Sequence, residues 1–451
     1  MLTEITRKAV LAAISLMLMS CAAYDLSSRH QHGLNLDVVA QTAKNAVEKE
    51  FNVDLGHVKW EVADAYRLNR LTYLTAHSEY KKMVNHPFYA RLLSDSASSN
   101  ASTGILGKYK DNIKTIFINP ERLDESYGYD MVNLAIARQI YLSLFIHEFV
   151  HAADFAKFTE ELRSEAYLPG QSELLSAMLE GNAEYITEKL CKEYACEEGY
   201  DIINHGSKEK SRKTQKSSSE KSKKQGRLSK IYKEELRFRY RLGKQYIADK
   251  YQAFPDKDPM PRNLAELPDS QMLILYPEND RLKQNSFKTA TQLMDALSVL
   301  QSYFPDEGYV YHYEVFSPPR LLDAVKKQTS IKLSLKDANP PYLQAMTLKL
   351  HWMPDKSKVV NNQGDYDLIV IDMGEEEKSQ RFMQQVADGQ ENKPLLNTIE
   401  RQSTDSVVRY IAADQKMVIQ SEGYVLLVEL DKGKINTDYV LKFSTDILSS
   451  I

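Results

Sequence analysis

The stretch from Met131 to Lys157 contains neither Gly nor Pro, and most of its residues are apolar. A run of this length and composition predicts one long helix that is buried in a helical domain. His147, Glu148 and His151 interrupt its most apolar part. Buried imidazole and carboxylate groups cost free energy unless they find partners. The run therefore constrains the fold, because another part of the chain must satisfy these three side chains.

His147 and His151 belong to a His-Glu-x-x-His pentapeptide. Four residues make just over one helical turn, so both imidazoles project from the same face and can bind one Zn²⁺ ion. Glu148 lies beside them, where it can take a proton from a metal-bound water. The alternative is a coincidental polar patch on a core helix, which leaves the burial cost of the three side chains unexplained.

A catalytic zinc ion with two histidine ligands needs a third protein ligand and an open position for water. Glu180, on the next predicted helix (Glu173–Glu198), is the candidate. Gly181 and Ala183 are small, which lets this helix approach the first closely. Glu184 follows Glu180 by one turn and can hydrogen-bond a ligand imidazole. For both glutamates the alternative is an exposed helix carboxylate. The pattern predicts one Zn²⁺ per chain.

These residues carry a resemblance to a known group. Glu180-Gly181-x-Ala183-x-Tyr185 resembles the EGxAxY ligand helix of gluzincin-type zinc metallopeptidases, which place HExxH on one helix and a glutamate ligand on the next. Two later segments are similar to bacterial and archaeal relatives of this form. Tyr240-x-x-Gly243-x-x-Tyr246-Ile247 resembles their YxxGxxF helix, and Ser270–Glu278 resembles their S-T-E-Q-I-L-H-P-E segment. The last segment departs from the family at Gln271, Met272 and Leu273, and Tyr276 stands where the relatives carry histidine.

The resemblance covers roughly residues 110–330 and implies peptide-bond hydrolysis, with His147, His151 and Glu180 as zinc ligands and Glu148 as the base. It also implies an edge strand before the HExxH helix that binds the substrate backbone, for which Lys114–Ile118 is the candidate.

A catalytic role is also open for Tyr276. A tyrosine hydroxyl in the position of the relatives' histidine can donate a hydrogen bond to the charged intermediate. The alternatives are that Tyr276 only packs before Pro277, and that His312 is the donor.

The N-terminus has the pattern of a bacterial export signal. Arg7 and Lys8 precede a short apolar run, Ala9–Met19, and Ser20-Cys21 follows at once. Leu18-Met19-Ser20-Cys21 resembles the lipobox, in which the cysteine is lipidated and becomes the first mature residue. The alternative is a plain signal peptide with an incidental Cys21. In a Gram-negative bacterium, Ala22 in place of a retaining aspartate favours the outer membrane, facing the periplasm.

Two further cysteines, Cys191 and Cys196, lie five residues apart. An unbroken helix points them to different faces, so a disulfide requires the helix to end near Tyr194. A disulfide and two buried thiols both remain open at this point.

The predicted fold class is α+β, with a signal peptide at 1–20, a mainly helical gluzincin-like metallopeptidase domain at 21–330 and a small α/β domain at 331–451. The last domain is predicted from strand patterns at Met346–Trp352, Tyr366–Asp372, Val407–Ala412, Lys416–Ile419 and Tyr424–Leu430, and from helix patterns at Glu375–Ala387 and Thr437–Leu448. Residues 207–230 hold ten Lys or Arg against two acidic residues, which predicts a disordered insertion. This insertion is either simply solvated or contacts anionic components of the cell envelope.

Composition narrows the function. The 58 basic and 62 acidic residues nearly balance, so we expect no nucleic-acid partner. The favoured function is a lipid-anchored zinc peptidase in the cell envelope, acting on a peptide or protein. The rivals are a non-catalytic zinc-site lipoprotein that acts in envelope assembly or as a chaperone, and an envelope-binding module. The intact Glu148 argues against the non-catalytic rival.

We expect Cys21→Ala to convert a detergent-extracted membrane protein into a soluble one, because acyl chains contribute about 0.8 kcal/mol per buried methylene. Membrane fractionation at low and high salt measures this. Membrane association that persists at high salt would contradict the lipid anchor. Association at low salt alone would implicate the 207–230 segment, since exposed charge contacts are screened.

Overall fold

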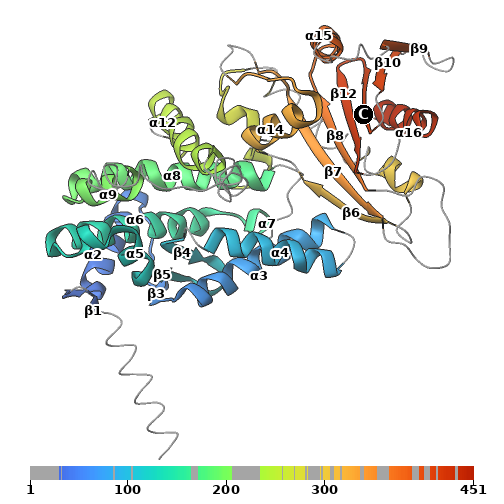
Figure 1. The fold of residues 1–451 in the computed structure, drawn as a ribbon. Coiled ribbons are helices and arrows are strands. Elements are labelled where there is room, and N and C mark those ends of the chain that lie inside the picture. Colours follow the sequence, from blue (N-terminus) through green and yellow to red (C-terminus); the bar gives the residue numbers. More distant parts are fainter. Residues whose placement is uncertain are drawn as a thin grey trace, which may run out of the picture. The chain divides into compact units, whose positions relative to one another are not determined.

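The computed structural model (Figure 1) describes residues 30–31, 33–84, 87–102, 105–163, 171–205, 234–255, 257–268, 270–279, 282, 295, 298–304, 309–314, 317–335, 340–352, 365–388, 396–400, 407–412, 415–431 and 435–450. The predicted signal peptide with Cys21 and the basic segment 207–230 lie outside this range. Among the described helices, none is long and apolar enough to cross a membrane.

The chain is mostly helical and divides into two compact units. The first contains residues 1–74, 97–157 and 182–218, and the second contains residues 75–96, 158–181 and 219–451. The boundary passes through one continuous helix, α8 (Gln171–Glu193). The predicted domain limits at 20 and 330 stay predictions.

The first unit surrounds the helix α6. In chain order its elements are β1 (His30–Gln31), β2 (Leu34–Asn35), α2 (Leu36–Phe51), β3 (Lys59–Val62), the start of α3 (Ala65–Met83), the end of α4 (Pro87–Ser102), β4 (Gly107–Lys110), η1 (Asp111–Ile113), β5 (Thr115–Ile118), α5 (Pro120–Met131), α6 (Leu134–Lys157), the end of α8 and α9 (Glu197–His205). The helices α2 and α9 both pack on α6, and its side chains are buried on nearly every side.

The predicted helix Met131–Lys157 begins three residues later than expected. The helix α5 ends at Met131, and α6 starts at Leu134 after a turn. The side chain of Asn133 explains this start, because its Oδ1 accepts a hydrogen bond from the Ala135 backbone N–H at 3.0 Å. Such a side chain satisfies one of the donors that a helix leaves free at its first turn.

A three-stranded sheet lies in the first unit, in the order β3-β5-β4. The predicted strand Lys114–Ile118 corresponds to β5, whose four residues are all buried. The prediction that it is an edge strand is wrong, because β3 pairs with one side of β5 in parallel and β4 pairs with the other side antiparallel. Among the strands that the structure describes, β4 pairs with β5 alone, and β4 also contacts α6.

The predicted helix Glu173–Glu198 consists of two helices. The helix α8 ends at Glu193, Ala195 takes a left-handed conformation with φ 55°, and α9 starts at Glu197. This break lies where a bridge between the two cysteines requires it, and the structure joins Cys191 to Cys196 in a disulfide. Both cysteines are fully buried.

The second unit is built around a seven-stranded sheet in the order β6-β7-β8-β12-β11-β10-β9. Its strands are β6 (Tyr309–Glu314), β7 (Gln344–Trp352), β8 (Tyr366–Asp372), β9 (Leu396–Glu400), β10 (Val407–Ala412), β11 (Lys416–Ser421) and β12 (Tyr424–Leu430). Every neighbouring pair is antiparallel. The five predicted strands are thus present. Their antiparallel pairing agrees with the α+β class that we predicted for the chain, whereas the α/β type that we expected for the C-terminal domain is wrong.

Both faces of this sheet are buried by helices (Figure 1). Alternate residues of β7 and β8, such as Leu348 and Val370, pack on one face with α16 (Thr437–Ser450). Their neighbours, such as Ile369, pack on the other face with α14 (Pro318–Thr329) and α15 (Glu376–Asp388). Two-sided burial explains why β8 is continuously apolar from Leu368 to Ile371.

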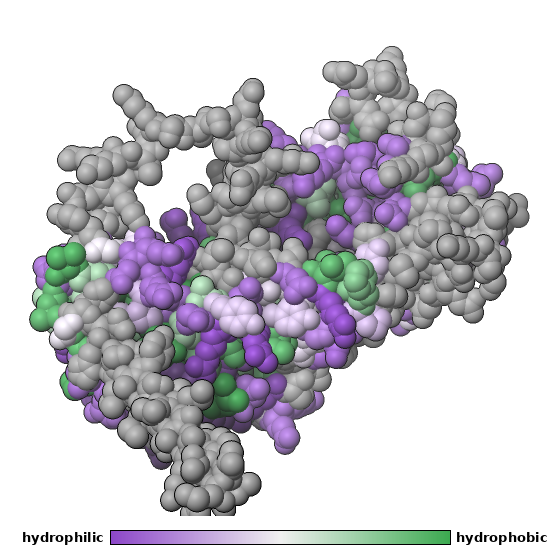
Figure 2. Space-filling view, turned by 60° about the horizontal axis from the view of Figure 1, so that its bottom comes forward, coloured by the Kyte–Doolittle hydropathy of each residue, from purple (hydrophilic) through white to green (hydrophobic). Residues whose placement is uncertain are grey.

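The remaining elements of the second unit include the rest of α3 and α4, α7 (Glu160–Arg163), the π-helical turn η2 (Arg237–Leu242), α12 (Gly243–Ala253), η3 (Leu264–Glu266) and η4 (Gln271–Ile274). On the face of the molecule in Figure 2, hydrophilic side chains predominate among the described residues, and hydrophobic ones form separate small groups.

Two glycines let α8 and α12 touch backbone to backbone. A Cβ added at Gly181 would lie 2.2 Å from the carbonyl carbon of Gly243, and one added at Gly243 would lie 2.1 Å from the carbonyl oxygen of Ala177. The backbone closest to Gly181 is therefore that of Gly243. We expected Gly181 to let α8 come close to α6. In the structure Gly181 instead lets α8 come close to α12.

We expect Gly243→Ala to lower the free energy of unfolding by about 1–3 kcal/mol or more, because the new methyl group overlaps a backbone oxygen that cannot move away cheaply. Urea unfolding measures this. The matched control is Gly128→Ala on α5, where an added Cβ meets no atom within 4 Å. Equal stability of the two variants would contradict the packing described here.

Candidate metal centre

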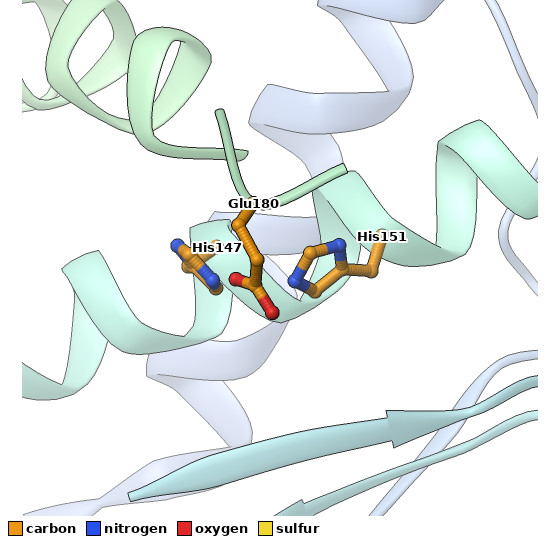
Figure 3. Close-up of side chains that lie close together, drawn as sticks. All are labelled: His147, His151 and Glu180. Atoms are coloured by element: carbon orange, nitrogen blue, oxygen red, sulfur yellow. The ribbon is translucent and has the colours of Figure 1, made fainter. Parts of the chain in front are cut away.

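Three side chains converge between α6 and α8. His147 and His151 come from consecutive turns of α6, and Glu180 comes from α8. One ligand atom from each residue can be chosen so that all three lie within 4.8 Å of one another. Figure 3 shows both imidazoles and the carboxylate pointing toward the same space. The structure therefore brings together the three ligands that the sequence predicted.

The donor set suits zinc. Two imidazole nitrogens and one carboxylate oxygen are a ligand set that Zn²⁺ takes in catalytic sites, with the fourth position left to water. All three residues are half-buried, so the group retains access to solvent on one side. Two distinct nitrogen ligands argue against Ca²⁺ or Mg²⁺, which prefer oxygen.

The carboxylate of Glu184 lies directly behind one ligand. Its Oε1 is 3.4 Å from Nδ1 of His147, and its side chain is only 9% exposed. Its Oε2 accepts hydrogen bonds from the Tyr200 hydroxyl at 2.8 Å and from Asn204 Nδ2 at 3.0 Å. Burial, and then the neighbouring Glu184 carboxylate, raise the pKa of the Tyr200 hydroxyl, so it remains a donor at neutral pH. A carboxylate on Nδ1 leaves Nε2 of His147 to face a metal.

A second polar contact joins the two ligand helices. Asn182 Nδ2 donates to both carboxylate oxygens of Asp154, at 2.9 and 3.0 Å, and both side chains are fully buried. Asp154 follows His151 by three residues, and Asn182 follows Glu180 by two. A contact so close to both ligands fixes the spacing of α6 and α8 at the site.

Glu148 is 4% exposed and lies against β4. A Cβ added at Gly107 would be 2.9 Å from Oε1 of Glu148 and 3.1 Å from Cδ1 of Leu144. A side chain at this position would require the Glu148 carboxylate and Leu144 to shift. The residue proposed as a base therefore lies between the two histidines of α6 in sequence and beside the edge strand β4 in space.

Two of the segments that carry the family resemblance touch one another in the second unit. Gly243 of the Tyr240–Ile247 segment touches Gly181, as described above. Burial, and then the charge of Glu278, raise the pKa of Tyr246 to about 12, so the end of the Ser270–Glu278 segment lies near this ring. Ser270 Oγ donates to the backbone oxygen of Leu343 at 2.8 Å. The later segments thus belong to one packed structure.

Tyr276 and His312 both have packing roles in the second unit. Tyr276 packs against an apolar cluster that contains Met272 and Tyr342. His312 on β6 is 7% exposed, and its ring meets that of Tyr80 edge to face, with centroids 5.7 Å apart. These contacts account for both residues structurally, and the catalytic role of Tyr276 stays a prediction.

Sequence reasoning missed four polar residues around the site: Asp154, Asn182, Tyr200 and Asn204. The first two carried a usable signal, because each lies within one turn of a predicted ligand on a predicted helix. Tyr200 and Asn204 carried none, since they lie beyond Glu198, where the predicted helix ends.

Comparisons with protein-family models, with curated proteins and with solved structures gave no match.

Glu180→Gln should weaken zinc binding by more than about 100-fold, because it replaces the anionic ligand. Mutation of a residue that only hydrogen-bonds a ligand already lowers metal affinity by about 10–100-fold. Competition with a chromophoric chelator measures the affinity. The control is Glu188→Gln, two turns further along α8, where the carboxylate pairs with Lys192 at 3.0 Å. Similar zinc affinities in the two variants would remove Glu180 from the ligand set.

Proposed function

We propose that this protein is a zinc-dependent peptidase, anchored to a membrane of the cell envelope through Cys21. The observation that carries the proposal is the convergence of His147, His151 and Glu180 within 4.8 Å, with the buried Glu148 next to the first histidine. The backbone contact between Gly181 and Gly243, which lie in two of the segments that resemble gluzincins, supports it.

The chemistry would divide between the metal and the chain. Zinc bound by the three ligands would lower the pKa of a coordinated water and polarise the scissile carbonyl group. The Glu148 carboxylate would accept a proton from the attacking water and pass it to the leaving amine nitrogen.

The strand β4 would align the substrate. It pairs with β5 on one side, and no other described strand pairs with it. An extended peptide can add to such an edge through main-chain hydrogen bonds, which are independent of the peptide's sequence. Gly107 on this strand lies against Glu148, so a peptide bound along β4 would pass close to the base.

Glu148→Gln separates catalysis from metal binding. The amide keeps the shape of the side chain and leaves all three ligands in place, so we expect near-normal zinc content. Hydrolysis of a broad peptide library should fall by about 10²–10⁴-fold, the usual contribution of a general base. Zinc content by atomic absorption and cleavage by mass spectrometry provide the two measurements, with Glu188→Gln as the matched control.

The outcome distinguishes the proposal from its rival. If the wild-type chain binds zinc but cleaves no member of the library, the non-catalytic zinc-site protein is the better description. Loss of zinc from Glu148→Gln equal to that from Glu180→Gln would contradict the roles assigned to these two residues.

A further inference from the structure

The helix α9 supports the metal centre from behind. Its residues Tyr200 and Asn204 are four apart, which places both on one face of the helix. Both donate hydrogen bonds to the same oxygen of Glu184, at 2.8 and 3.0 Å. The other oxygen of Glu184 lies 3.4 Å from Nδ1 of His147. An uninterrupted series of polar contacts therefore leads from α9 to a metal ligand.

The position of α9 is itself fixed within the first unit. The Cys191–Cys196 disulfide joins the end of α8 to the residue that precedes α9, and the Cys196 N–H donates to the Cys191 carbonyl at 2.9 Å. The helix α9 also packs along α6. The Tyr127 hydroxyl donates to the backbone oxygen of Ile203 at 3.2 Å. The disulfide thus closes the tight turn that directs α9 back toward Glu184.

We infer that Tyr200 and Asn204 are positioning residues for the metal centre, and that the Cys191–Cys196 disulfide holds them in place. A buried carboxylate needs donors to keep its charge and its orientation. With both donors present, Glu184 stays directed at His147 and fixes the ring with Nε2 toward the metal. Without them, the carboxylate loses the contacts that restrain its rotamer, and the imidazole loses a fixed partner.

This inference rests on the metal site of the proposed function but not on hydrolysis. Its test is therefore metal binding by the full-length chain, with Zn²⁺ and with Co²⁺, whose visible absorption reports on ligand geometry. We expect Tyr200→Phe to weaken zinc binding about three- to tenfold and to alter the Co²⁺ spectrum, because outer partners of a ligand tune the metal. Asn204→Ala should act in the same direction.

Tyr127→Phe is the matched control. It also removes a tyrosine hydroxyl that bonds α9, but that hydroxyl bonds the backbone of Ile203 and does not touch Glu184. Its zinc affinity and Co²⁺ spectrum should equal those of the wild type. An equal effect of Tyr127→Phe and Tyr200→Phe would show that general loosening of α9, and not the bond to Glu184, is responsible.

A double-mutant cycle tests whether Tyr200 acts through Glu184. Glu184→Gln should weaken zinc binding about 10–100-fold. Adding Tyr200→Phe to that variant should lower its zinc affinity little further. Full additivity of the two changes would overturn the proposed order of contacts. Normal zinc binding by Tyr200→Phe, beside normal binding by the wild type, would overturn the inference alone. A wild-type chain that binds neither ion would overturn the metal site, and this inference with it.

A variant without the disulfide tests whether the disulfide holds α9 in place. Cys191→Ser with Cys196→Ser should lower zinc affinity in the same range as Tyr200→Phe and change the Co²⁺ spectrum in the same way. The melting temperature of the metal-free variant measures general destabilisation separately. A wild-type affinity and spectrum in this variant would show that α9 keeps its position without the disulfide.

Discussion

A metal ion can bind between α6 and α8 only if one ligand atom from each of His147, His151 and Glu180 lies within about the 4.8 Å seen here, and the candidate site depends on that geometry. A helix advances 1.5 Å per residue and turns by 100°, so a slip of one residue between α6 and α8 would remove Glu180 from the histidines. Two contacts made by residues that follow this glutamate on α8 oppose such a slip. Asn182 bonds Asp154 next to His151, and Glu184 lies against His147.

These contacts are polar and buried, so the position of one helix against the other depends on keeping each polar group paired. A carboxylate such as Asp154, with no exposed surface, is stable inside a helical domain only if donors surround it. Once paired, it can be displaced only at the cost of leaving a partner unsatisfied. A pair of this kind therefore fixes one helix spacing more sharply than apolar packing alone, which tolerates small shifts.

Close backbone contacts add a second restraint. Gly181 allows α12 to press on α8 immediately after the ligand Glu180, and Gly107 allows β4 to press on Glu148. At Gly181 the neighbouring atoms are backbone, so the absence of a side chain there is what permits the close contact beside Glu180. The glycine in the sequence motif that resembles gluzincins thus has a physical task, which is contact with the Tyr240–Ile247 segment.

The sequence by itself determined the local parts of this protein. One-turn spacing put His147 and His151 on one helix face, and the apolar pattern gave β8, β10 and β12 their observed bounds, because both signals arise from neighbouring residues. Tertiary structure alone decided that β5 is a central strand, that the C-terminal sheet is antiparallel, and that Tyr200 and Asn204 support Glu184. Strand order and polar pairing depend on contacts between segments far apart in the chain. The free energy of those contacts exists only when the chain is folded, so the periodicity of neighbouring residues cannot predict them.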